Sequence, residues 1–271
     1  MTEHLLDATL SRAASILGLG LIVARLGAGG VRATIGLVGS ALVVAGTLGQ
    51  LFVGTFAIAG RLSADAVVEV VLGTAFGATA ATAIGAGALL VVAHAIASGR
   101  SPGDRVASAA APIAFAWALS AQGHGAEPHT RTLVHAIHLG AASVWLGGLV
   151  VLVDGVEREA GSRARAVIAF SRLALWLVIV VLGTGIARAA AHVRSVTQLG
   201  DDYGRVLLLK LGLGAGALAF AVRHRRRTLP VLSSRAEIPR AFERDVAAEL
   251  VLVLCTLLAA TALGQLPPPR D

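Results

Sequence analysis

Long apolar runs are the feature that most restricts what this chain can fold into. Several of them exceed 18 residues and are separated only by short segments that contain arginine or glycine. A run of that length is a candidate membrane span. Only 14% of the 271 residues are charged, against roughly 25% in soluble domains. In lipid the backbone must satisfy its own hydrogen bonds, which favours helices. We therefore predict an all-α, polytopic integral membrane protein with about eight transmembrane helices in one bundle.

The predicted spans divide the chain into two sets of about four helices. The fourth span is the weakest, because Pro112 and Trp117 interrupt it and it barely reaches the required length. We assign residues 1–122 to an N-terminal set and residues 123–271 to a C-terminal set. The expected spans are 6–26, 33–59, 66–97, 106–122, 131–153, 167–192, 204–223 and 246–266.

Basic residues between the spans predict the orientation of the bundle. Arginines gather in alternate connections, most densely in RHRRR (223–227), and such connections are retained in the cytoplasm. This pattern places both termini on the extracytoplasmic side of the cytoplasmic (inner) membrane. It also accounts for the net charge of +7 without nucleic acid as a partner; the bilayer is the expected partner. Glu3 and Asp7 argue against a cleavable signal peptide.

Histidines gather at the side of the membrane that we assign as extracytoplasmic. His124 and His129 belong to the expected loop 121–130, His135 and His138 follow on the next helix, and His192 ends the sixth span. Residues at i and i+3 lie on one helix face, and imidazole is a common ligand for copper, zinc and iron. We predict metal or haem ligation, with His138 as the strongest candidate because it lies deepest. The alternative is that single histidines are ordinary residues of the membrane boundary.

Several other residues within or beside the spans are candidates for a transport path. Lys210 is the chain's one lysine, and intramembrane charges are costly enough to suggest function. The alternatives are structural: Lys210 and Glu249 could form ion pairs, and Trp145 could simply fill the core. We expect no direct Lys210–Glu249 pair because their depths differ, and we expect Glu249 to pair with Arg244 or with residues of 223–227. The further path candidates are Tyr203, Cys255 and His94.

Five motifs in residues 120–271 together resemble the CopD/PcoD copper-resistance family of bacterial inner-membrane proteins. They are HAIHLGAASVWLGGLVVL, FSRLALWLVIVVLGTGIARA, YGRVLLLKLGLG, RHRRRTLP and ERDVAAELVLVLCTLL. The resemblance implies copper transport across the cytoplasmic membrane, with a periplasmic CopC-type copper-binding protein as a partner. It points to His124, His138, Tyr203, Lys210 and Glu249. The chain departs from a thioether-lined copper path, because Met1 is its one methionine.

Two alternatives to copper transport remain open. His138, Trp145 and the glycine pair 147–148 also resemble HemJ-type membrane protoporphyrinogen oxidases, which implies haem b and an oxidoreductase. A scaffold without a ligand is the other alternative. No nucleotide-binding loop, hydrolytic triad or HExxH motif stands out in the sequence, so we expect a transport protein and no enzyme.

Overall fold

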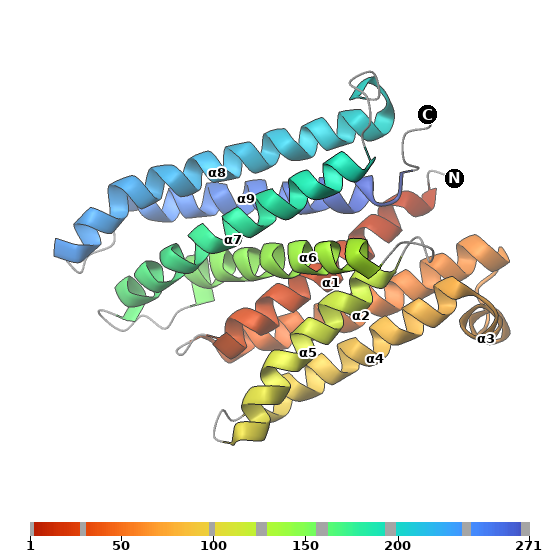
Figure 1. Ribbon diagram of the computed structural model, residues 1–271. Helices are drawn as coiled ribbons and strands as arrows, with labels where there is room; N and C mark the ends of the chain where they lie inside the picture. The colour runs from red at the N-terminus through yellow and green to blue at the C-terminus, as the bar shows by residue number, and fades with distance from the viewer. Residues whose placement is uncertain are drawn as a thin grey trace.

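The computed structural model describes residues 3–27, 31–97, 101–122, 129–155, 162–192, 199–234 and 240–266. These ranges form a bundle of long helices (Figure 1). The helices of the N-terminal part are α1 (Glu3–Gly27), α2 (Ala33–Ala59), α3 (Ala64–Gly73), α4 (Ala75–Ile96) and α5 (Pro102–Ala121). Those of the C-terminal part are α6 (His129–Val150), the π-helical turn η1 (Val151–Gly155), α7 (Ser162–His192), α8 (Asp202–Ser234) and α9 (Arg240–Leu263).

The helical membrane fold is confirmed. Within the described residues, 7 helices are long and apolar enough to cross a membrane. The fourth expected span, 106–122, forms α5 but is not among them, in keeping with its Pro112 and the charged first turn of α5. Figure 1 shows α5 running along α4, and it places the start of α1 and the end of α9 at the same end of the bundle.

The third expected span, 66–97, is wrong as a single helix. The chain breaks at Thr74, which has an extended backbone (φ −129°, ψ 150°) between α3 and α4. The Thr74 hydroxyl accepts a hydrogen bond from the Gly77 N–H at 2.9 Å and caps the start of α4, as threonine commonly does at helix N-termini. The short α3 is thereby turned across the end of the bundle (Figure 1).

Two boundaries near the predicted loops also differ from expectation. α8 continues through 223–227 to Ser234 instead of ending at 223. His129, expected in a loop, is the first residue of α6 and is exposed. In both places the polar residues extend a helix beyond its apolar stretch, so the apolar run alone underestimates its length.

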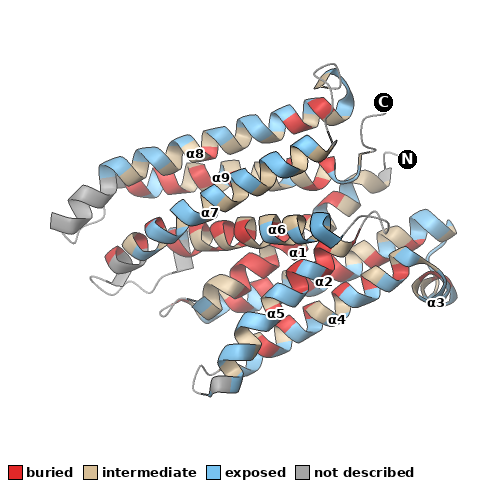
Figure 2. Ribbon diagram, viewed as in Figure 1, coloured by how far each residue is buried: buried red, intermediate tan, exposed pale blue. Residues whose placement is uncertain are grey.

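α1 and α6 form the interior of the bundle, where buried positions concentrate (Figure 2). The two helices cross at Gly20 and Gly147. A Cβ at Gly147 would overlap the Gly20 carbonyl, and a Cβ at Gly20 would overlap the Ser143 carbonyl. Small residues allow such close approach of membrane helices. The crossing therefore holds α6 directly against α1 and fixes where its other side chains point.

Candidate functional site

The H-x6-W-x-G-G motif of α6 contacts three neighbouring helices. Gly147 receives the backbone of α1, as described above, and Gly148 receives the ring of Phe170 from α7. His138 contacts α7 and Trp145 contacts α9. Each member of the motif thus has a packing or hydrogen-bonding role, and two of them lead to buried polar clusters.

His138 is held against α7. Its Nδ1 lies 2.9 Å from the Thr184 hydroxyl oxygen, and its ring lies over Gly185, where an added Cβ would be 3.5 Å from the ring. The Thr184 hydroxyl also donates to the Val180 carbonyl oxygen at 2.5 Å. Because that hydroxyl proton is used, the simplest arrangement has Nδ1–H donating to Thr184, which leaves Nε2 as the ring nitrogen able to bind a metal.

Cationic side chains from three other helices surround His135 and His138. Arg188 of α7 interacts electrostatically with Arg12 of α1, with both histidines and with Lys210 of α8. Arg12 also donates to the Leu119 carbonyl oxygen at 2.9 Å. We call Arg12, His135, His138, Arg188 and Lys210 the histidine cluster. Three of its five members carry positive charge. The predicted path residue Lys210 therefore lies near the predicted ligands His135 and His138.

Of the remaining predicted ligands, His129 is the exposed first residue of α6. His124 lies outside the described residues, and of His192 the structure describes the backbone alone, at the end of α7. Among the described residues, no group of three or more His, Cys, Asp or Glu side chains is close enough to hold a metal ion. The full five-histidine site stays a prediction.

A second buried cluster surrounds Glu249 of α9, which is 1% exposed. The indole Nε1–H of Trp145 donates to its Oε1 at 3.0 Å. On the other side, Nδ1 of His224 from α8 lies 3.3 Å from Oε2. That separation is within ion-pair range, but neither atom makes a hydrogen bond. Trp145 therefore fills the core, as one alternative held, and also binds a polar partner.

One turn before Glu249, α9 carries a second carboxylate, Asp245, which is 9% exposed. Arg223 Nε lies 3.3 Å from its Oδ2. We call Trp145, Arg223, His224, Asp245 and Glu249 the Glu249 cluster. Glu249 pairs with 223–227, as expected, but through the histidine of that segment and not through an arginine.

Sequence reasoning expected the contact of Glu249 with 223–227 but missed the contacts that this segment makes with Asp245 and Ser171. Besides Arg223 and His224, Arg225 donates to the Ser171 carbonyl and hydroxyl oxygens of α7 at 2.5 and 3.1 Å. A signal was available: Asp245 and Glu249 are spaced i, i+4 where α9 passes into its apolar stretch. Such a pair shows one acidic face that requires partners.

Three path candidates lie apart from both clusters or at their edge. His94 packs over Gly36 of α2, and its buried Nδ1 makes no hydrogen bond. Cys255 is a free, half-buried thiol on α9. Tyr203, at the start of α8, interacts electrostatically with Arg188 at the edge of the histidine cluster. Lys210 and His224 are separated by fourteen residues of α8, about 21 Å at the helical rise, consistent with the expected absence of a Lys210–Glu249 pair.

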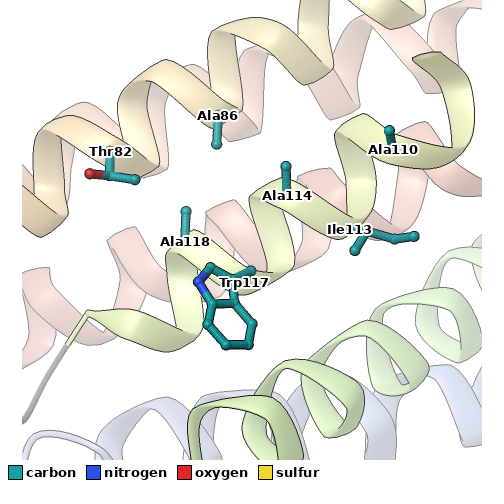
Figure 3. A pocket seen from close by; sticks show the side chains of 7 residues that line it. All are labelled: Thr82, Ala86, Ala110, Ile113, Ala114, Trp117 and Ala118. Atoms are coloured by element: carbon teal, nitrogen blue, oxygen red, sulfur yellow. The ribbon is translucent and has the colours of Figure 1, made fainter. Parts of the chain in front are cut away.

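An apolar hollow of about 530 Å³ lies between α4 and α5 (Figure 3). Ile113 and Trp117 line it and are 70% and 38% exposed. Thr82 is the one polar residue of its lining. The hollow carries no metal-binding side chain and, in a membrane, faces hydrocarbon.

The haem alternative requires two ligands on opposite sides of a planar ring, or one ligand facing an open pocket. The candidate ligand pairs are His138 with His192, and His94 with a partner on another span; the His192 side chain lies outside the described residues, and His94 packs over Gly36 of α2. The described residues therefore do not support haem.

Taken together, the helices and the two buried clusters define a polytopic helical membrane protein with ionisable groups in its interior. Residues 164–263 match the family model described as Copper resistance protein D, CopD. This match confirms the resemblance over α7, α8 and α9, and it includes Thr184, Lys210, His224 and Glu249.

A comparison with curated proteins also points to copper. The chain is 29% identical over 174 residues to the Copper transport protein CutJ of Bacillus subtilis (strain 168). The alignment covers 59% of this chain and 31% of that protein, so the chain spans about a third of the relative's length. No solved structure matches the chain. These findings support a copper-related membrane function.

Proposed function

We propose that this protein moves copper inward across the cytoplasmic membrane and meets it at a histidine-lined mouth on the extracytoplasmic side. The match of residues 164–263 to CopD and the likeness to a copper transport protein support copper as the cargo. The observation that carries the site is the His138 imidazole, fixed by Thr184 within the bundle. A deep, oriented imidazole is a metal ligand with one nitrogen already committed to a supporting residue.

The proposed mouth comprises five histidines. His135 and His138 are its inner part, and His124, His129 and His192 are its outer part. Both termini are extracytoplasmic in this proposal, as the arginine distribution favours. A periplasmic CopC-type copper-binding protein is the proposed donor.

The histidine cluster also bears on the oxidation state of copper. Arg12, Arg188 and Lys210 repel a cation, and they repel a divalent ion twice as strongly as a monovalent one. Imidazole ligands accept either ion. We therefore propose Cu(I) as the form that passes His138.

Copper uptake into vesicles containing the purified protein tests this function. We expect His138→Ala to reduce the initial rate at least tenfold, because the deepest imidazole is lost. The matched control is Leu133→Ala, which shortens an exposed side chain on the same helix that is not part of the proposed mouth and should change the rate less than twofold. Equal rates in wild type and His138→Ala would contradict the proposed site, and uptake no faster than in empty vesicles would contradict the function.

A further inference from the structure

The Glu249 carboxylate has one oxygen that Trp145 binds and one that it does not. Oε1 accepts the indole hydrogen bond at 3.0 Å. Oε2 is buried and has no hydrogen-bond partner, and the whole residue is only 1% exposed. Buried polar atoms are nearly always paired, and a buried carboxylate oxygen is among the costliest to leave unpaired.

The atom facing Oε2 is in the same condition. His224 Nδ1 is buried, lies 3.3 Å away and makes no hydrogen bond. The His224 ring is held in place by Phe242, whose ring meets it edge-on with centroids 5.5 Å apart. Two potential ligand atoms from α8 and α9 thus face each other inside the bundle.

We propose that His224 and Glu249 bind copper on its way through the bundle, with Trp145 as the positioning residue. The proposal rests on copper being the cargo. Two nitrogen or oxygen ligands bonded at about 2.0–2.1 Å with a tetrahedral angle lie about 3.3–3.4 Å apart, as in four-coordinate metal sites. The observed 3.3 Å between Nδ1 and Oε2 fits that arrangement, whereas a linear two-coordinate ion would separate its ligands by about 4 Å.

The charge of the surroundings favours a cation here more than at the histidine cluster. Arg223, which precedes His224 on α8, is engaged by Asp245 at 3.3 Å. That pair leaves the Glu249 carboxylate with His224 and Trp145 as its described partners. Trp145 orients the carboxylate from behind, as supporting residues do at metal sites.

Two protein ligands make a weak site. No third His, Cys, Asp or Glu completes it in the part of the chain that the structure describes. Weak binding suits a transported ion, which must leave as readily as it arrives. His224 and Glu249 would therefore form a transit site and not a storage site.

Copper binding to the purified full-length protein, measured by equilibrium dialysis with copper alone, tests the proposal. We expect Glu249→Gln to weaken one class of site at least tenfold, since the amide keeps the shape and the oxygen that accepts from Trp145. His224→Gln should weaken the same class. The matched control is Glu69→Gln, where the side chain is 71% exposed and no change is expected.

The double variant His135→Ala with His138→Ala separates this site from the proposed mouth. We expect it to retain the class of site that Glu249→Gln removes. Wild-type binding in Glu249→Gln would overturn the inference and identify a structural ion pair, while the uptake defect of His138→Ala would still support the proposed function. Loss of all binding in the double variant would also overturn the inference. A wild-type protein that binds and transports no copper would overturn both.

Discussion

The two buried clusters differ in charge although both centre on histidine. The histidine cluster combines His135 and His138 with three cationic side chains. The Glu249 cluster combines His224 with two carboxylates and one arginine. The same imidazole chemistry is thus placed in a repulsive environment for a cation at one end of the bundle and in an attractive one at the other. A histidine alone does not define a metal site, because its neighbours decide which ions can approach.

α6 joins the two clusters, so the largest expected effect comes from breaking its crossing with α1. Gly147→Leu would force a side chain into the Gly20 carbonyl, and overpacking costs typically about 1–3 kcal/mol and more where backbone cannot move. We expect loss of folded protein by size-exclusion chromatography and thermal unfolding in detergent. Gly140→Leu is the control, because an added Cβ there meets no atom within 4 Å. Equal stability of the two variants would refute the crossing.

A smaller effect is expected from a change confined to the Glu249 cluster. Trp145→Phe removes the N–H that binds Glu249 at 3.0 Å. Loss of a buried hydrogen bond to a carboxylate costs about 1.5–3 kcal/mol, so the free energy of unfolding should fall by that amount. Trp176→Phe supplies the comparison, since Trp176 is 67% exposed and its replacement should cost under about 0.5 kcal/mol. A Trp145 variant as stable as the Trp176 variant would argue against the hydrogen bond.

The smallest expected effect tests the charge of the histidine cluster. Lys210→Gln removes one cation near His138. Removing one nearby like charge relieves Coulomb repulsion of a bound cation on the order of 1 kcal/mol. We expect Cu(I) affinity at the histidines to rise about fivefold, measured by competition with a chromophoric chelator. Arg205→Gln, an exposed charge on the same helix, should leave the affinity unchanged, and a fall in affinity for Lys210→Gln would contradict the electrostatic argument.

The sequence predicted the helices better than their ends. Apolar runs identify the spans because burial in lipid depends on composition summed over a whole segment. The break at Thr74 is not visible in the summed hydropathy of the segment. It depends on one local feature, the Thr74 hydroxyl that caps Gly77. Summed hydropathy also misses the continuation of α8 through Arg223 and His224, because those polar side chains contact partners on α9.

The candidate site was predictable in its residue types and less so in its pairings. His138 and Glu249 stand out because polar side chains at depth require partners. Their partners are distant in sequence: Thr184 lies 46 residues from His138, and Glu249 lies 104 residues from Trp145. Such contacts depend on which helices become neighbours, and local periodicity carries no information about that.

The spacing of His138 and Trp145 on α6 has a consequence for how an ion could travel. Seven residues separate them, about 10 Å at the helical rise. Between them α6 offers a single polar side chain, Ser143, whose hydroxyl is committed to the Leu139 carbonyl at 2.8 Å. Along α6 an ion would therefore find no free ligand between His138 and the Glu249 cluster. Its passage would require the surrounding helices to move, so that the ligands of the two clusters come closer together.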